Sequence, residues 1–335
     1  MINIGIIGVG YWGPNYARLC FEMGDVNLSW CADLDENALK KIQQRYPSVK
    51  TTKNYKEILN DPKLDAVVIV TPAQTHFTIA KDALLANKHV LLEKPITSKL
   101  SEAKELGKVV SKSKKILMVD HIFKFNPTVT KLKELINNDE LGNIYYIAAS
   151  YTALGPIRKD VDAMWDLAPH WIYVINHLLN EKPVTIQANG KDYLKEKMND
   201  VVFLHLEYPR KVLVNIHVSW LFPQKVRNIA IVGDKKMAVM DDVSSDTKLA
   251  LFDKGAKYNS NDPNFANLQV IFREGDIVIP KLEKKEPLKE VLKHFCECIT
   301  NDKNPFTGVK EGIDVIEILE AADRSLQKKG EVVTL

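Results

Sequence analysis

The chain has 335 residues, of which 45% are hydrophobic and 27% charged, and its formal net charge is +3. This length allows two domains of ordinary size, and the composition is typical of a soluble globular protein. The small net charge, with lysines scattered among acidic residues, argues against a nucleic-acid partner. No stretch approaches the roughly 18 to 20 apolar residues of a membrane span. No basic segment precedes an apolar one at the N-terminus, so we expect a cytoplasmic protein without a signal peptide.

Apolar strands alternate with helical patterns from Met1 to about His121. This alternation predicts a parallel, doubly wound sheet of the α/β class in a first domain of residues 1–121. Strands are expected at residues 2–8, 26–32, 65–70, 88–92 and 115–119. Helices are expected at residues 14–23, 36–45, 76–86 and 101–113.

The pattern changes after Pro127, and residues 122–335 are expected to form a second, α+β domain. Helical patterns cover residues 128–137, 165–179 and 313–328. The half-buried strands at 201–207 and 212–218 lie on either side of Pro209-Arg210, as in a hairpin. We therefore expect a large, mainly antiparallel sheet. The Asn- and Asp-rich segment 259–267 is expected to be a loop.

The four cysteines fit no metal-binding spacing. They are Cys20, Cys31, Cys296 and Cys298, and the last two stand alone in an amphipathic helical pattern. A structural zinc site needs ligands in paired spacings, which are absent from the sequence. We expect buried or idle thiols and no metal site.

A Gly-x-Gly-x-x-Gly turn lies directly after the first predicted strand. Pro14 follows it and begins a helix, where the missing N–H costs nothing. In such a turn Gly8 permits the tight bend, and Gly10 lets the backbone approach a pyrophosphate. Gly13 lets the helix and the strand pack closely, with helix N–H groups facing the phosphates. The turn predicts a dinucleotide ligand.

Asp33 follows the second strand, 20 residues beyond Gly13, where this type of fold places an acidic residue at the adenosine ribose. A carboxylate there accepts hydrogen bonds from both ribose hydroxyls and repels a 2′-phosphate, which favours NAD over NADP. Asp33 and Asp35 could instead be only turn residues, with Asp35 as the N-cap of the next helix. Tyr11 and Trp12 lie in the turn and could cover the pyrophosphate or nicotinamide, or pack between the domains.

Two further strands end in residues that suggest chemistry. The third ends at Thr71-Pro72, with His76 near the start of the next helix, and the fourth ends at Glu93-Lys94. Both ends fall at the carboxyl edge of the sheet, where open α/β folds bind ligands, so Lys94 is expected to point towards the cofactor. Its ammonium group could polarise a hydroxyl or carbonyl oxygen. The alternative is a surface lysine paired with Glu93.

Asp166 and His170 are four residues apart and share a face if the segment is helical. An imidazole with a carboxylate partner can accept a substrate proton near neutral pH. The alternative is a hydrogen-bonded core histidine. Pro169 also allows the helix to begin there, with Asp166 near its N-cap.

Together these residues resemble the glucose-fructose oxidoreductase, inositol dehydrogenase and MocA family of sugar dehydrogenases over essentially the whole chain. The resemblance rests on Gly8-x-Gly10-x-x-Gly13, Thr71-Pro72 with His76, Glu93-Lys94-Pro95, the turn at 141–144 and Asp166-x-x-x-His170, in the family's order. It implies an N-terminal Rossmann domain and a C-terminal domain whose open sheet contains the substrate site and commonly the dimer or tetramer contacts. It also implies that Lys94 and His170 flank a sugar carbon that gives hydride to the nicotinamide.

Within this family, residues 10–15, 155–158 and 165–170 resemble the branch acting on nucleotide-linked amino sugars, such as UDP-N-acetylglucosamine 3-dehydrogenases. This resemblance implies oxidation of a secondary hydroxyl, the 3-hydroxyl of the sugar. Arg158 is a candidate for the substrate diphosphate, because a guanidinium group suits phosphate oxygens; the alternative is a solvent-exposed arginine. The residues expected at the cofactor are Gly8, Gly10, Tyr11, Trp12, Gly13, Asp33, Thr71, Pro72, His76, Glu93 and Lys94. Those expected at the substrate are Lys94, Arg158, Trp165, Asp166 and His170.

The chain departs from the family's usual residues at Asn87, Trp171 and Tyr173. The last two substitutions affect the fine geometry near His170 and not the reaction class. Two other functions stay open: a dehydrogenase of a free cyclitol or simple sugar, and an NAD-binding regulatory protein without turnover. The expected partners are a small sugar or nucleotide-sugar substrate and further copies of the chain in a homodimer or homotetramer, with no nucleic acid and no membrane.

Overall fold

The computed structural model describes residues 1–258 and 270–335, which form two compact units. The first unit comprises residues 1–125 and 285–320, and the second comprises residues 126–284 and 321–335. The loop expected at 259–267 lies outside the described residues. Within the described ranges, no helix has the length and apolar character needed to cross a membrane.

The first unit contains a six-stranded sheet in the order β3-β2-β1-β4-β5-β6, with every neighbouring pair parallel. The strands are β1 (Ile2–Ile7), β2 (Val26–Ala32), β3 (Lys50–Thr52), β4 (Ala66–Ile69), β5 (His89–Glu93) and β6 (Leu117–Asp120). The strand order reverses between β1 and β4, so the predicted doubly wound parallel sheet is confirmed. β3 is short and was not predicted.

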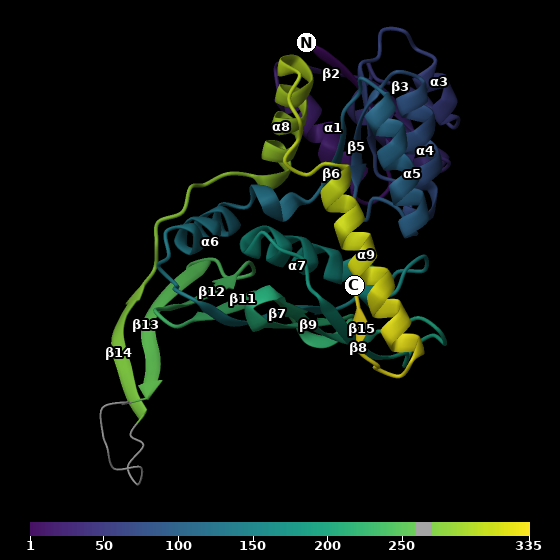
Figure 1. The fold of residues 1–335 in the computed structure, drawn as a ribbon. Coiled ribbons are helices and arrows are strands. Elements are labelled where there is room, and N and C mark those ends of the chain that lie inside the picture. The colour runs from purple at the N-terminus through teal and green to yellow at the C-terminus, as the bar shows by residue number, and fades with distance from the viewer. Residues whose placement is uncertain (259–269) are drawn as a thin grey trace. The chain divides into compact units, whose positions relative to one another are not determined.

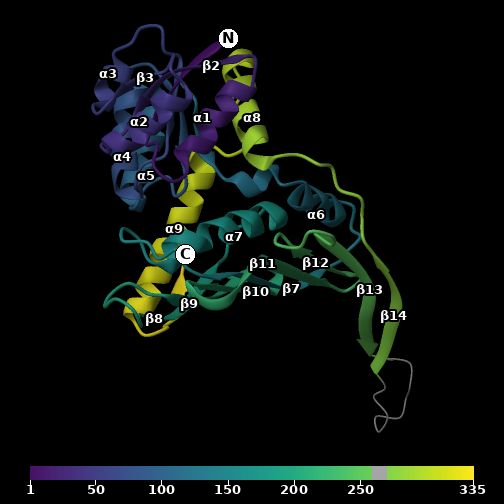
Figure 2. The same cartoon turned by 180° about the vertical axis from the view of Figure 1, so that it is seen from behind.

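Helices flank this sheet (Figures 1 and 2). They are α1 (Gly13–Glu22), α2 (Glu36–Arg45), α3 (Tyr55–Leu59), α4 (Ala73–Leu85), α5 (Leu100–Lys112) and α8 (Pro287–Asn301), with the 3-10 turn η1 (Ile122–Phe125). Asp35 caps α2, because its side chain accepts a hydrogen bond from the backbone N–H of Asn37 at 2.8 Å. From late in the chain, α8 contributes Leu288, Leu292 and Phe295 to the same core as β1 and α1.

The second unit contains a nine-stranded sheet in the order β14-β13-β12-β11-β7-β10-β9-β8-β15. The strands are β7 (Ile144–Leu154), β8 (Thr185–Lys191), β9 (Val201–Tyr208), β10 (Val212–Ser219), β11 (Leu221–Gly233), β12 (Met237–Asp241), β13 (Leu249–Tyr258), β14 (Val270–Val278) and β15 (Val333–Thr334). Among the described strands of this sheet, only β7 and β10 pair in parallel. The predicted hairpin of β9 and β10 turns through the 3-10 segment η2 (Pro209–Lys211). The mainly antiparallel sheet is therefore confirmed.

Three helices lie over one face of this sheet: α6 (Pro127–Asn137), α7 (Ala163–Leu179) and the end of α9 (Val309–Gln327). α7 packs on β10 and β7. Along β10, Val214 and Ile216 are buried on the covered face, whereas Leu213 and Asn215 alternate with them on the other. No described helix of this unit covers that outer face.

The start of α7 decides how Asp166 and His170 are related. Asp162 is the N-cap, and its side chain accepts a hydrogen bond from the backbone N–H of Trp165 at 3.0 Å. The possibility that the helix begins at Pro169, with Asp166 near its N-cap, is therefore wrong. Pro169 lies inside the helix and removes one backbone hydrogen bond. Since both residues belong to one helix, Asp166 and His170 share a face.

Candidate functional site

The fingerprint turn has the backbone geometry that a dinucleotide requires. Gly8 has φ of +96°, and a Cβ there would lie 2.6 Å from the carbonyl oxygen of Val70. A Cβ on Gly13 would lie 2.1 Å from the carbonyl oxygen of Gly8. A Cβ on Gly10 would meet no atom within 4 Å, so the space beside it is open to a ligand. This cradle at the N-terminus of α1 fits a pyrophosphate group.

The two aromatic residues of the turn differ in their surroundings. Tyr11 is 90% exposed. Trp12 is partly buried against the core of the first unit, and its indole N–H is buried with no hydrogen-bond partner among the described residues. Tyr11 is thus available to a ligand on the turn, whereas Trp12 anchors the turn to the core.

Asp33 holds the fingerprint turn in place. One carboxylate oxygen accepts a hydrogen bond from the backbone N–H of Val9 at 2.7 Å, and the other accepts one from the N–H of Asp35 at 2.9 Å. A carboxylate has about four lone-pair sites, so capacity remains for ribose hydroxyls. The position of Asp33 beside the turn therefore suits both binding of the adenosine ribose and a role as a turn residue.

A pocket of about 410 Å³ opens beside the same turn. Its wall from α2 includes two cationic side chains, Lys41 and Arg45. The other lining residues are Val9, Gly10, Pro14, Asp35, Ala38, Ile42 and Tyr46. The pocket lining thus combines apolar and cationic side chains, a combination suited to a nucleotide.

His76 links the ends of β4 and β5. It is 1% exposed, and its ring nitrogens lie 2.8 Å from the carbonyl oxygens of Pro95 and Thr71. Because carbonyl oxygens only accept hydrogen bonds, each ring nitrogen bonds its carbonyl only when it is protonated. His76 therefore fixes the loop that follows Lys94. The peptide bond between Lys94 and Pro95 is cis. The role of His76 in the structure is to position these loops.

The remaining residues predicted at the cofactor in this part of the sheet lie at the same carboxyl edge. The Thr71 hydroxyl accepts a hydrogen bond from Thr75 at 2.7 Å, and Pro72 is exposed at the N-cap of α4. Glu93 and Lys94 are both half-buried at the end of β5. This edge is where doubly wound sheets bind ligands.

Two buried groups next to Lys94 were missed by the sequence analysis. Asp120 ends β6 opposite Glu93 and accepts a hydrogen bond from the buried hydroxyl of Tyr16 on α1. Burial raises the pKa of Asp120 to about 6, although the Tyr16 hydrogen bond and the nearby charge of Lys94 lower it. A signal was present in the sequence, since Asp120 directly follows a buried apolar strand at the carboxyl edge.

His121 follows Asp120 and is also buried. Burial lowers the pKa of this imidazole to about 3, and the charge of Lys94 acts in the same direction. Lys94 therefore stands beside a buried carboxyl group and a neutral imidazole. These groups set the electrostatic surroundings of its ammonium group.

In the second unit, Asp166 links Arg158 to Trp220, which lies between β10 and β11. One Asp166 oxygen lies 3.4 Å from the Arg158 guanidinium, and the other accepts a hydrogen bond from the Trp220 indole at 3.3 Å. Arg158 also binds Asp160 through two hydrogen bonds of 2.9 and 2.7 Å. The hydrogen bonds to Asp160, followed by the charge of Asp166, raise the pKa of Arg158 against its partial burial. Arg158 is therefore paired with two carboxylates, although its side chain is still 38% exposed.

His170 stacks on a residue that the sequence analysis missed. The rings of His170 and Tyr151 have centroids 5.3 Å apart and planes inclined by 13°. The Arg227 guanidinium lies 4.5 Å from the centroid of the Tyr151 ring and pairs with Asp242 at 3.7 Å. Burial raises the pKa of Tyr151 to about 12, partly offset by Arg227. Nothing in the local sequence pattern identified these partners, because they come from different strands.

Trp165 is tied to the end of α9. Its indole N–H donates a hydrogen bond to Asp323 at 2.9 Å. The predicted substrate residues Arg158, Trp165, Asp166 and His170 thus lie on α7 and the segment before it. Lys94 and the predicted cofactor residues belong to the first unit.

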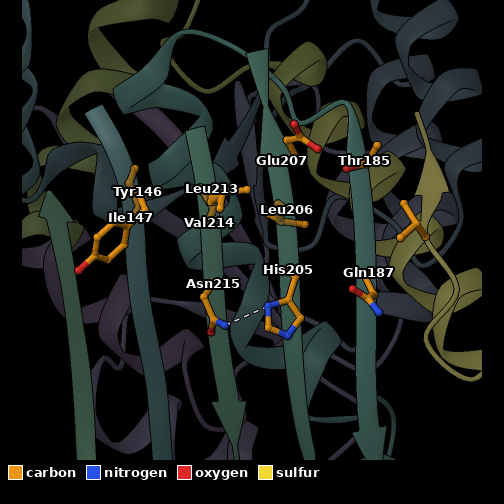
Figure 3. A pocket seen from close by; sticks show the side chains of 11 residues that line it. Tyr146, Ile147, Thr185, Gln187, His205, Leu206, Glu207, Leu213, Val214 and Asn215 are labelled. Carbon is orange, nitrogen blue, oxygen red and sulfur yellow. Dashed lines mark hydrogen bonds between the residues drawn. The ribbon is translucent and has the colours of Figure 1, made fainter. Parts of the chain in front are cut away.

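A pocket of the second unit lies elsewhere, on the outer face of the sheet (Figure 3). Its volume is about 560 Å³, and Asn215 contacts His205 across it with 3.0 Å between their side-chain nitrogens. The lining comes from β7, β10, β9 and β8, with Val332. None of the residues predicted at the cofactor or substrate lines it. This pocket is therefore separate from the candidate site.

The sequence matches two family descriptions. Residues 2–121 match the oxidoreductase family with an NAD-binding Rossmann fold. Residues 129–239 match the GFO/IDH/MocA C-terminal domain. The first match covers the fingerprint turn, Asp33 and Lys94, and the second covers Arg158, Asp166 and His170.

Several curated proteins are similar in sequence. The uncharacterized oxidoreductase YdgJ of Escherichia coli (strain K12) is 33% identical over 179 residues, which are 50% of this chain and only about half (51%) of YdgJ. The UDP-N-acetylglucosamine 3-dehydrogenase of Acidithiobacillus ferrooxidans is 25% identical over 307 residues, 88% of this chain and 91% of that protein. The myo-inositol 2-dehydrogenase of Thermotoga maritima is 22% identical over 346 residues, 99% and 98% of the two chains.

A solved structure has the same fold. The crystal structure of GenD2 from gentamicin A biosynthesis, in complex with NAD, superposes with a TM-score of 0.84. The comparison covers 100% of this chain and 96% of GenD2 at 20% sequence identity. At this identity the similarity establishes the fold alone.

Proposed function

We propose, from the premise that this chain belongs to the GFO/IDH/MocA oxidoreductase family with its NAD-binding Rossmann fold, that it oxidises a secondary hydroxyl of a sugar with NAD. The observation that supports this most directly is Lys94 at the carboxyl end of β5, in a sheet whose fingerprint turn has an open cradle at Gly10. The helix α7 adds an acid and an imidazole on one face, Asp166 and His170.

The proposed roles follow from the chemistry of each side chain. NAD, when bound, supplies the hydride acceptor. His170 accepts the proton of the sugar hydroxyl, and Asp166 stabilises the imidazole when it becomes charged. Lys94 donates a hydrogen bond to the same oxygen and stabilises its developing negative charge. Tyr151 holds the His170 ring by stacking.

We assign the cofactor to the first unit. Gly8, Gly10 and Gly13 form the pyrophosphate cradle, and Asp33 accepts hydrogen bonds from the ribose. Tyr11 covers the turn from the solvent side, in keeping with its exposure. His76 acts indirectly, because it holds the loops after β4 and β5 through Thr71 and Pro95.

For the substrate we propose the 3-hydroxyl of a nucleotide-linked amino sugar such as UDP-N-acetylglucosamine. Support comes from the 25% identical dehydrogenase of Acidithiobacillus ferrooxidans. Arg158 is the proposed contact for the diphosphate.

One observation favours a second candidate, a free cyclitol or simple sugar. The Arg158 guanidinium is already paired with Asp160 and Asp166, so a diphosphate would have to compete with two carboxylates. The similarity to myo-inositol 2-dehydrogenase points the same way. For either substrate we further propose a homo-oligomeric protein of the cytoplasm, in keeping with four buried, free thiols.

The test is turnover with NAD and a panel of UDP-sugars and free cyclitols, read as NADH absorbance with the product identified by mass spectrometry. Lys94→Met and His170→Asn are expected to abolish turnover while NAD affinity, measured by calorimetry, changes little. Lys99→Met is the matched control, because the Lys99 side chain is 68% exposed and lies outside the proposed site.

The outcomes separate the candidates. NADH formation with UDP-N-acetylglucosamine alone supports the nucleotide-sugar substrate, whereas turnover only with free polyols leaves the cyclitol candidate. NAD binding without turnover of any substrate would point to the regulatory alternative. Loss of NAD affinity in Lys94→Met would make Lys94 a structural residue and contradict the mechanism.

A further inference from the structure

β14 is an edge strand with an unusual number of exposed apolar side chains. It lies at one end of the nine-stranded sheet and, within the part of the chain that the structure describes, pairs only with β13 (Figures 1 and 2). Phe272 is 74% exposed, and Val270, Ile271, Ile277, Val278 and the following Ile279 are exposed as well. Natural proteins usually protect such edges with charges, prolines or covering elements, because an open edge pairs with other strands. An exposed, apolar edge of this length therefore indicates a partner strand.

The sequence of this strand is nearly symmetric about the junction of Glu274 and Gly275. Three apolar residues, a cation and Glu274 precede the junction, and Gly275, an anion and three apolar residues follow it. If a second copy of β14 runs antiparallel and is centred there, Phe272 lies opposite the partner's Ile277. Arg273 then lies opposite the partner's Asp276. The two-fold axis creates each of these contacts twice.

A bulge in the hairpin makes this register possible. Residues that lie opposite each other in an antiparallel pair must point to the same face of the sheet. Phe272 and Ile277 are five residues apart, so regular alternation would place them on opposite faces. However, Phe272 pairs with Ala256 and Ile277 pairs with Phe252, two residues four apart on β13. The bulge after Phe252 adds one residue to β14, and Phe272 and Ile277 consequently share a face.

In the same antiparallel pairing, the bulge places Arg273 and the partner's Asp276 on one face of the sheet. Arg273 follows Phe272 and Asp276 precedes Ile277, so both point to the opposite face from those two apolar residues. Arg273 pairs with Asp253 of its own chain at 2.9 Å, and its guanidinium is still partly exposed. A partner's Asp276 would extend this pair into a small network. Gly275, opposite Glu274, has no side chain to clash.

We propose that β14 pairs antiparallel with β14 of a second copy of this chain, joining two nine-stranded sheets at their edges. A second copy is favoured over another protein because both the apolar residues and the charges of the strand complement the strand itself. This interface involves none of the proposed catalytic residues, so its test does not depend on activity.

The first test is register-specific disulfide formation between full-length chains. Phe272→Cys protein is mixed with Ile277→Cys protein, allowed to exchange and mildly oxidised. The proposal expects a covalent dimer on a non-reducing gel that approaches roughly half of the chains, the share of mixed pairs under random exchange. The four native cysteines are buried and do not interfere.

Three controls fix the register. Each variant alone is expected to stay unlinked, because the two copies of position 272 would lie five residues apart along the strands, about 16 Å. Mixing Phe272→Cys with Val270→Cys is also expected to give no covalent dimer. A parallel pairing in register would instead link Phe272→Cys protein to itself. Absence of the product in the main mixture, or equal yields in the controls, would overturn the proposal.

The second test is association in solution. Phe272→Lys places a charge on the open edge, and we expect it to weaken self-association at least tenfold in sedimentation velocity across a concentration series. Leu85→Lys is the matched control, since Leu85 is an exposed residue of α4 in the first unit and should change nothing. Circular dichroism confirms that both variants fold. A monomer at every concentration, or identical behaviour of Phe272→Lys and wild type, would refute the pairing.

Discussion

The phenol ring of Tyr151 stacks on the imidazole of His170 at a centroid distance of 5.3 Å. Tyr151 comes from β7 and His170 from α7, so the stack fixes the orientation of a helix side chain from the sheet. We expect Tyr151→Ala to lower kcat/KM about tenfold, because aromatic pairs contribute about 0.5–1.5 kcal/mol beyond the burial of their surface. Tyr151→Phe keeps the stack and should retain most of the activity. Steady-state kinetics with the substrate found in the panel checks this, and equal losses in the two variants would contradict a stacking role.

The glycines of the fingerprint turn should separate cofactor binding from stability. Gly13→Ala places a Cβ 2.1 Å from the carbonyl oxygen of Gly8, so we expect a lower Tm as well as loss of NAD binding. Gly10→Ala meets no protein atom within 4 Å, so its Tm should stay close to that of wild type. Its methyl group would instead obstruct the pyrophosphate, and NAD affinity should fall at least tenfold. Thermal unfolding with calorimetric titration of NAD tests both. Unchanged NAD affinity in Gly10→Ala would place the pyrophosphate elsewhere.

Asp120 should make the stability of the protein depend on pH. Its pKa of about 6 in the folded chain exceeds the value of about 4 expected when unfolded. Below about pH 4 the carboxyl group is protonated in both states, and above about pH 6 both states are ionised and the folded one bears the cost of a buried charge. The contribution of Asp120 to the free energy of unfolding should therefore fall as the pH rises from 4 to 6, by an amount on the order of 3 kcal/mol.

Asp120→Asn isolates this contribution. The amide oxygen can still accept the hydrogen bond from Tyr16, and the titration of His121 and the charge of Lys94 remain in both proteins. Urea unfolding at pH 4, 5, 6 and 7 gives the difference between variant and wild type. We expect Asp120→Asn to gain stability relative to wild type as the pH rises through this range. A difference that is flat with pH would show that the Asp120 carboxyl titrates normally.

Secondary structure could be predicted from the sequence where a local pattern of residues determines it. The parallel sheet could be predicted because each of its five predicted strands is a short apolar run, and Asp35 could be recognised as a cap because its role depends on neighbouring residues. α3 and β3 were missed because each is only a few residues long. The packing of α8 on α1 was also not predicted, since an amphipathic pattern identifies the buried face of a helix but not its partner.

The candidate site was predictable to the same extent. Lys94 and the glycines could be found because they directly follow strands, and His170 because it lies four residues from Asp166 on one helix. Tyr151 and Arg227 were not predicted, because the pairing of β7 with β11 brings them together. The two residues are more than 70 positions apart in the chain. Side chains that are brought together by the register of paired strands have no characteristic spacing in the sequence.

Arg158 distinguishes the two candidate substrates. If it binds a diphosphate, Arg158→Ala should raise KM for a UDP-sugar by about tenfold to a hundredfold with little change in kcat, because a charge-assisted contact contributes about 1.5–3 kcal/mol. If Arg158 only neutralises Asp160 and Asp166, Arg158→Ala should lower kcat, because it changes the charge balance beside His170, the proposed proton acceptor. Asp160→Asn is the informative partner variant, because it frees the guanidinium from its bidentate contact. It should lower KM for a UDP-sugar in the first case and leave it unchanged in the second. Steady-state kinetics of both variants on UDP-N-acetylglucosamine and on myo-inositol decides between them.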